Sequence, residues 1–249
     1  DAVDALQRAY DAGTTDEFST NFFAVYETVL RRVPLFTAIG NHEGSSSDSG
    51  TQSGPYYNAY VTPTAGELGG VPSGTEAYYG FDWGNVHFIV LDSHDSSRDP
   101  DGPMMTWMRD DALATDRDWL VAVWHHPPYT KGTHDSDDEG QLIDMRENAL
   151  PILEAAGVDL VLAGHSHIYE RSFLIDGAYD TPTTAEGHVV DGGDGDPIGM
   201  GPYRKTAGAG NDGAVYVVAG HGGAGLGGSA DHPVMYFSEI AHGSCLLDV

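Results

Sequence analysis

Three short polar clusters, each placed after an apolar run, contain side chains that could hold a metal ion. They are Gly40-Asn41-His42-Glu43, His125-His126 and Gly164-His165-Ser166-His167. Imidazole nitrogens suit zinc and iron, and an amide oxygen can also coordinate a metal. His165 and His167 are two residues apart, so in extended backbone their side chains lie on the same face. The residue types and their spacing therefore indicate a metal site assembled from distant parts of the chain.

Each cluster follows a segment that we predict to be a β-strand. These segments are 34–39, 120–124 and 158–163. Ligands of open α/β sheets bind beyond the carboxyl ends of the strands, so side chains at three such ends can converge on one point. A single histidine at a strand end is more often a hydrogen-bonded polar residue than a ligand. That interpretation would require all three clusters to be incidental, and we therefore favour a metal site.

The rest of the chain alternates between helical and extended patterns. Periodicity and turn residues predict helices over 2–12, 17–32, 104–115 and 141–156, strands over 77–82, 86–92, 214–219 and 245–249, and loops over 44–75 and 176–212. Strands that alternate with helices favour a layered α/β domain. We interpret residues 1–249 as one such domain.

The three clusters resemble a known set of motifs. Gly40-Asn41-His42-Glu43, Val123-Trp124-His125 and the run from Gly164 to Arg171 are similar to the last three of the five motifs of the calcineurin-like metallophosphoesterases. Within that run, Tyr169-Glu170-Arg171 resembles the purple acid phosphatase branch, as does the later Val217-Val218-Ala219-Gly220 with Gly222-Gly223-Ala224-Gly225. The resemblance extends from about residue 30 to the end and implies a layered α/β/β/α sandwich with mixed sheets.

The same resemblance implies a dinuclear centre. Asn41, His125 and His165 would bind one metal ion and His167 the other, with Fe, Zn or Mn as the metals. His42 would lie beside the metals without ligating them, where it contacts the phosphate or assists the leaving group.

One further histidine is implied to face the substrate. His134 falls nine residues after His125, a position where this family often has such a residue, and a solvated loop histidine is the alternative. The implied activity is hydrolysis of a small phosphoric monoester by a metal-bridging hydroxide. A phosphodiesterase or nucleotidase on the same site, or a catalytically inactive metal-binding module, are the alternatives.

The chain departs from the family pattern in one respect. The first two motifs, an Asp at a strand end and a Gly-Asp at another, should precede Asn41, but the first 40 residues contain no Gly-Asp pair. Asp1, Asp4, Asp11 and Asp16 lie in helical or loop patterns instead. We favour a chain that is incomplete at both ends over a degenerate protein that lost one metal site.

The charge of the chain excludes some classes of partner. The net charge is -27, from 38 acidic and 11 basic residues. Such a field repels nucleic acid and anionic membranes, and no window approaches the roughly 18 apolar residues of a membrane span. An acidic surface with only Lys131 and Lys205 as lysines favours a halophilic protein over an ordinary acidic one. Because relatives of this branch are commonly secreted, we expect an extracellular or cell-surface location.

Several other polar residues are expected to be structural. Asp92, at the end of a predicted strand, could approach the metals but is expected to be a structural cap, and His87 and His94 fit no pattern. The acidic run Asp135–Glu139 lacks the spacing and the glycine of an EF-hand, so a solvated loop is favoured over a calcium site. Cys245 lies in an apolar run and is predicted to be a small buried hydrophobe.

Overall fold

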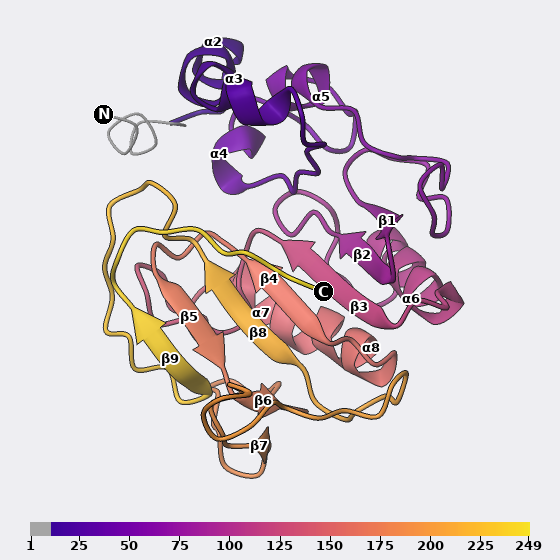
Figure 1. Ribbon diagram of the computed structural model, residues 1–249. Helices are drawn as coiled ribbons and strands as arrows, with labels where there is room; N and C mark the ends of the chain where they lie inside the picture. Colours follow the sequence, from indigo (N-terminus) through magenta and orange to yellow (C-terminus); the bar gives the residue numbers. More distant parts are fainter. Residues whose placement is uncertain (1–10) are drawn as a thin grey trace.

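A seven-stranded mixed sheet forms the centre of the computed structural model, which describes residues 11–249. Its strand order is β1-β2-β3-β4-β8-β5-β9, and a separate pair, β6-β7, lies at one end (Figure 1). Neighbours from β2 to β8 are parallel, whereas β1, β5 and β9 pair antiparallel. The expected α/β fold with mixed sheets is confirmed.

The elements have the following bounds. The strands are β1 Tyr79–Trp83, β2 Val86–Val90, β3 Trp119–Trp124, β4 Leu160–Ala163, β5 Tyr169–Ser172, β6 Leu174–Ile175, β7 Val189–Asp191, β8 Val215–Ala219 and β9 Met235–Glu239. The helices are α2 Thr15–Glu17, α3 Ala24–Leu30, α4 Asn41–Gly44, α5 Pro55–Ala59, α6 Pro103–Ala114, α7 Gly140–Asp144 and α8 Leu150–Ala155, with π-helical turns at Phe18–Phe23 and Met145–Ala149. The predicted helix over 2–12 falls almost wholly outside the described residues.

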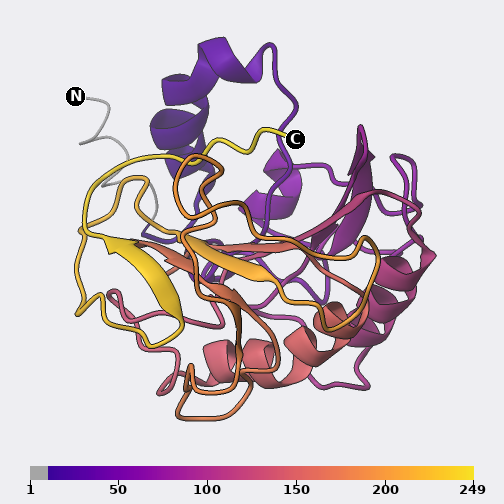
Figure 2. The same cartoon turned by 60° about the horizontal axis from the view of Figure 1, so that its bottom comes forward.

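Helices cover one face of the sheet. Figures 1 and 2 show α6, α7 and α8 on that side. Met104 and Met108 of α6 and Leu153 of α8 pack there against Ile89 and Val161 of the strands. All of these side chains are nearly inaccessible to water, and this burial of apolar surface is the main stabilising contribution to such a core. No helix of residues 11–249 has both the length and the apolar character required to cross a membrane.

The predicted strand at 34–39 is wrong. The segment is extended but pairs with no strand. Phe36 instead stacks on Phe81 of β1, with ring centroids 3.8 Å apart, and the carbonyl of Thr37 accepts hydrogen bonds from the hydroxyls of Tyr56 and Tyr79 at 3.1 and 2.9 Å. Side chains therefore hold this segment on the second face of the sheet, where no backbone ladder forms.

The predicted strand at 245–249 is also wrong. The C-terminal segment crosses the second face of the sheet in both views (Figures 1 and 2). Leu247 and Val249 line an open hollow of about 510 Å³ together with Trp119 and Val121 of β3. Cys245 is exposed, so its predicted burial is wrong too. The apolar run meets a face of the sheet and not an unpaired strand edge, which is why it forms no ladder.

β5 and β9 were not predicted, and in β5 polar residues hide the strand pattern. β5 contains Glu170 and Arg171, and the buried Glu170 accepts a hydrogen bond from Thr130. β5 pairs antiparallel with both β8 and β9. The polar side chain of Glu170 thus lies inside, against the expectation from hydropathy alone.

A buried charged bridge ties the β1–β2 hairpin to α6. His87 is 1% exposed, with Nδ1 2.7 Å from Asp82 Oδ1 and Nε2 2.9 Å from Asp111 Oδ2. Because a neutral imidazole has only one N–H, two carboxylate partners require the charged ring. Burial lowers the pKa of His87, but the hydrogen bonds with Asp111 and Asp82 outweigh this and raise the pKa above its usual value. His87 is structural, as predicted.

Replacing His87 by Gln is expected to lower the free energy of unfolding by about 2–3 kcal/mol near pH 6. This loss is at the lower end of what breaking a buried ion pair costs, because Asp82 is partly exposed to solvent. The folded pKa is raised, so this stabilisation is full below the unfolded pKa of about 6.5 and is lost as pH rises through the folded value. Urea unfolding near pH 6 and near pH 9 should therefore show the difference shrinking with pH. His188→Gln is the control, and an equal loss at both pH values would contradict a charged bridge.

Candidate metal centre

The register of two central strands places two of the polar clusters side by side. β3 and β4 are parallel neighbours, with Trp124 opposite Ala163. His125 and Gly164 are the next residues of each strand, and the Gly164 N–H donates to the His125 carbonyl at 3.0 Å. His165 follows immediately. Because parallel strands end at the same edge of a sheet, His125 and His165 meet there as predicted.

The third cluster reaches this edge as the short helix α4. Glu43 Oε2 accepts a hydrogen bond from the Gly40 N–H at 3.1 Å, which closes the first turn in the manner of a capping box. Asn41 and His42 are thereby held in the first turn of the helix. Glu43 is accordingly a structural residue of the motif, while Asn41 is left to face the strand ends.

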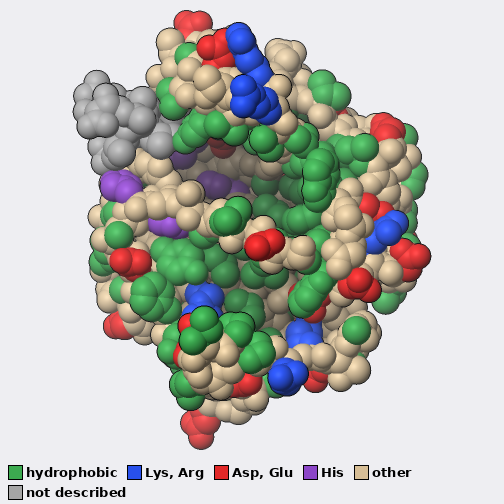
Figure 3. Space-filling view, in the orientation of Figure 1, with side chains coloured by type: hydrophobic (Ala, Val, Ile, Leu, Met, Phe, Trp, Pro, Cys, Tyr) green, Lys and Arg blue, Asp and Glu red, His purple; other side chains and the backbone are tan. Residues whose placement is uncertain are grey.

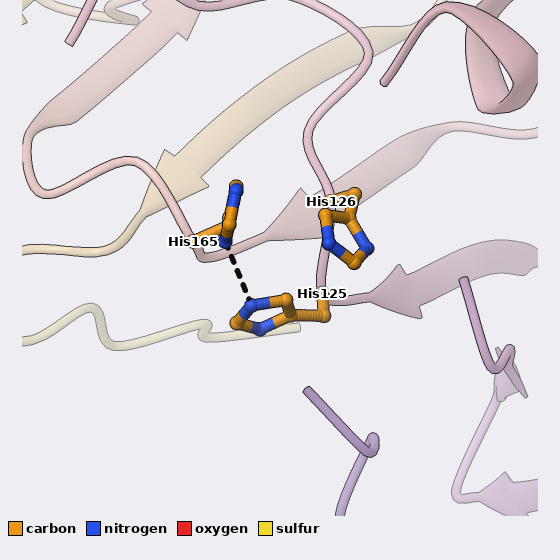
Figure 4. A group of neighbouring side chains, drawn as sticks. All are labelled: His125, His126 and His165. Atoms are coloured by element: carbon orange, nitrogen blue, oxygen red, sulfur yellow. Dashed lines mark hydrogen bonds between the residues drawn. The ribbon is translucent and has the colours of Figure 1, made fainter. Parts of the chain in front are cut away.

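Three donor atoms converge at the centre of this edge. Asn41 Oδ1 lies 2.7 Å from His125 Nε2, which lies 3.0 Å from His165 Nδ1. Figure 4 shows the His125 and His165 rings turned toward each other, with His126 beside them. Ligand atoms around a tetrahedral zinc ion are about 3.4 Å apart for bonds of about 2.1 Å. The amide oxygen and two imidazole nitrogens therefore fit a metal ion with little adjustment.

The imidazoles of this centre are neutral at neutral pH, which leaves lone pairs for a metal. Burial, followed by repulsion from neighbouring histidines, lowers the pKa of His125 well below its usual value. The same two causes lower the pKa of His126 to about 2 and, partly opposed by Glu139, that of His165 to about 4. Charge repulsion among seven histidines at this edge contributes to these lowered pKa values. Figure 3 shows a histidine side chain inside the hollow that lies below helices α2 and α3.

The backbone at His165 is in the left-handed region, with φ 61°. A non-glycine residue there costs about 1–3 kcal/mol and persists only where its surroundings enforce it, most often at functional sites. The following Ser166 N–H donates to the Gly164 carbonyl at 2.6 Å. This turn directs His165 Nδ1 toward His125.

The other predicted site residues surround these three. The ring of His134 stacks on that of His165 with centroids 3.8 Å apart, and the ring of His167 lies 6.4 Å from His134. His167 Nδ1 faces the Gly225 carbonyl at 3.1 Å. His42 is exposed, and its Nδ1 lies 3.2 Å from the Asp11 carbonyl. His134 thus lies against the centre, while His167 and His42 lie around it.

Two histidines at this edge were not predicted as site residues. His126 is buried, with Nδ1 2.9 Å from Ser93 Oγ and its ring centroid 4.5 Å from that of His165. His94 stacks on His126 with centroids 6.0 Å apart, and its buried Nδ1 has no hydrogen-bond partner among residues 11–249. The position of His94 just after β2, a parallel neighbour of β3, was the signal that could have placed it here. Asp92 caps this turn as predicted, since Oδ1 accepts from the His94 N–H at 2.9 Å.

Three of the four acids in the run after His134 have side-chain or backbone partners, and only Asp138 is exposed. Glu139 Oε1 lies 2.8 Å from His134 Nδ1, and Glu139 Oε2 lies 3.5 Å from His165 Nε2. Asp135 pairs with Lys131, and Asp137 accepts hydrogen bonds from Thr183. The solvated-loop interpretation is therefore wrong for these three acids. Nothing in the local sequence distinguishes Glu139 from its acidic neighbours.

The chain is similar to known phosphoesterases. The family model of the calcineurin-like phosphoesterases matches residues 4–169. Purple acid phosphatase 23 of Arabidopsis thaliana is 34% identical over 149 residues, which are 58% of this chain and 31% of that protein. Purple acid phosphatase 22 of the same plant is 35% identical over 166 residues, 64% of this chain and 36% of that protein.

A solved structure shows the same fold. Purple acid phosphatase PPD1 from seeds of yellow lupin (Lupinus luteus) superposes with a TM-score of 0.61 at 22% identity, covering 91% of this chain and 38% of that one. The chain thus spans less than two fifths of the length of these relatives. The predicted similarity to the purple acid phosphatase branch is confirmed.

Proposed function

Because the chain belongs to the calcineurin-like phosphoesterase family, we propose that it forms the metal-binding core of a metal-dependent phosphoric ester hydrolase. The finer proposal is a phosphomonoesterase of the purple acid phosphatase kind, acting on a small phosphorylated substrate at a dinuclear centre. One observation carries it: Asn41 Oδ1, His125 Nε2 and His165 Nδ1 meet at the carboxyl ends of parallel strands. Relatives named as purple acid phosphatases support the class of reaction.

We propose that Asn41, His125 and His165 hold one metal ion through the three converging atoms. His167 would hold a second ion through Nε2, because its Nδ1 faces the Gly225 carbonyl. Imidazole and amide donors suit Fe, Zn or Mn. Two such ions, when bound, supply Lewis acidity that neutralises charge on a phosphoryl group and acidifies water.

Two histidines of the rim are proposed to act on the substrate. His134 has Nδ1 engaged by Glu139, which leaves Nε2 directed away from the carboxylate and available to the substrate. His42, exposed in the first turn of α4, can donate to a phosphoryl oxygen or protonate the leaving oxygen. Both roles need only a single proton held at a ring nitrogen.

Metal analysis together with two substrates tests the proposed function. Two metal equivalents in the purified protein and faster hydrolysis of p-nitrophenyl phosphate than of its bis ester are the expected results. Faster hydrolysis of the bis ester would make the enzyme a phosphodiesterase. Zero or one equivalent without hydrolysis of either ester would favour an inactive metal-binding module.

Replacing His42 by Ala is expected to lower kcat by about 10²- to 10⁴-fold, the usual contribution of a general acid. Metal content should not change, since His42 is outside the group of converging donor atoms. Steady-state kinetics and elemental analysis on the same preparation check this, with His188→Ala as control. Loss of metal in the His42 variant would refute the proposed role.

A further inference from the structure

We infer that Glu139 is a positioning residue, whose carboxylate selects the tautomers of two site imidazoles. It directs the lone pair of His165 Nδ1 into the metal centre and leaves Nε2 of His134 for the substrate. The inference rests on the proposed function for its consequence in catalysis, although the tautomers themselves can be measured without it.

One carboxylate faces two rings. Glu139 Oε1 is 2.8 Å from His134 Nδ1, and Oε2 is 3.5 Å from His165 Nε2. The two rings are stacked on each other with centroids 3.8 Å apart and planes 30° from parallel. Each carboxylate oxygen therefore contacts a different imidazole, and Glu139 links the two stacked rings.

The backbone of Glu139 is anchored at the start of a helix. Glu139 caps α7, and its carbonyl accepts hydrogen bonds from the Leu142 and Ile143 N–H groups at 3.1 and 3.0 Å. Its own N–H donates to the Asp135 carbonyl at 3.3 Å. The carboxylate consequently projects from a fixed point and not from a free loop.

An ionised carboxylate only accepts hydrogen bonds, and a neutral imidazole has one N–H. Glu139 therefore favours the proton of His134 on Nδ1 and the proton of His165 on Nε2. The position of the proton on His165 matters most, because His165 Nδ1 is the atom that lies 3.0 Å from His125 Nε2. Carboxylates that accept from the far nitrogen of a ligating histidine commonly orient the ring and raise its basicity.

Nuclear magnetic resonance of the metal-free protein tests the tautomers directly. Long-range ¹H–¹⁵N spectra should show His165 as the Nε2–H form and His134 as the Nδ1–H form, assigned by loss of signals in His165→Asn and His134→Asn. Glu139→Gln should mix the two forms in at least one ring. Asp138→Asn is the matched control, since Asp138 is the adjacent, exposed acid and its loss changes the charge equally. Unchanged tautomers in the Glu139 variant would overturn the inference.

Metal affinity supplies the second measurement. Glu139→Gln should weaken zinc binding about 10- to 100-fold, the usual effect of removing such a partner, and saturating zinc should restore most of kcat. Glu139→Asp keeps the charge but shortens the side chain, and it should weaken zinc binding similarly. It provides the same test if Glu139→Gln does not fold. If Glu139→Gln instead bound one metal equivalent fewer than the unmodified protein, Glu139 would be a metal ligand, and the positioning role would be overturned.

The two proposals fail in distinguishable ways. Absence of metal binding and ester hydrolysis in the unmodified protein, with the expected tautomers present, would reject the proposed function alone. Metal-dependent hydrolysis that is indifferent to Glu139→Gln, with unchanged tautomers, would reject the positioning role alone.

Discussion

Replacing His125 by Ala is expected to lower kcat for phosphoric monoesters by about a thousandfold or more. His125 Nε2 contacts both Asn41 Oδ1 at 2.7 Å and His165 Nδ1 at 3.0 Å, so its loss removes the central donor of the three. Metal ions contribute several kcal/mol to such transition states, and each 1.36 kcal/mol is a factor of ten in rate. Kinetics at saturating substrate, with bound metal measured in parallel, check this.

A metal-dependent melting temperature provides an independent measurement for the same variant. An ion that binds the folded chain stabilises it by mass action, so added zinc should raise the Tm of the unmodified protein but not that of His125→Ala. His188→Ala should match the unmodified protein in kcat, in bound metal and in the response of Tm to zinc. Retention of the full metal content by His125→Ala would contradict a centre at these strand ends.

Replacing Gly220 by Ala is expected to damage both stability and metal binding. A Cβ on Gly220, which follows β8, would lie 1.9 Å from the Ser166 carbonyl oxygen and 2.8 Å from its carbon. Both are backbone atoms of the turn between His165 and His167, so the turn itself must move. Overpacking of this kind costs about 1–3 kcal/mol and occasionally more, and the upper end is expected because no flexible side chain can yield.

A matched control lies two residues further along. A Cβ on Gly222 meets nothing within 4 Å, so Gly222→Ala changes the same glycine-rich segment without touching the turn. Urea unfolding and metal content should separate the two variants clearly. If Gly220→Ala and Gly222→Ala were equal in both measurements, the close contact at Ser166 would not position the site.

Local patterns predicted the elements whose residues are apolar without interruption. The segments 120–124 and 158–163 became β3 Trp119–Trp124 and β4 Leu160–Ala163, and the hairpin of β1 and β2 formed around its predicted turn. Predicting a strand from an uninterrupted apolar run was wrong for 34–39, because such a segment can bury its side chains on a sheet without pairing with a strand. Phe36 does so by stacking on Phe81.

The convergence of the three donor residues was predicted from their motifs, but only in part for the right reason. His125 and His165 converge because the parallel neighbours β3 and β4 end at one edge, whereas Asn41 reaches that edge on α4, after a segment that pairs with no strand. The contribution of Glu139 was not predictable, because its partners lie both five residues away and across the fold. An acidic residue in an acidic run carries no local sign of the ring that it faces.

By itself, the sequence determined which polar residues follow which apolar runs, because runs of apolar residues and the polar residues that interrupt them are local properties. It also carried the motifs by which the chain belongs to the calcineurin-like phosphoesterase family. Only the tertiary structure decided which donor atoms meet and which carboxylate faces them. Those contacts depend on strand order and on the left-handed turn at His165, and both are set by packing between segments that are distant in the chain.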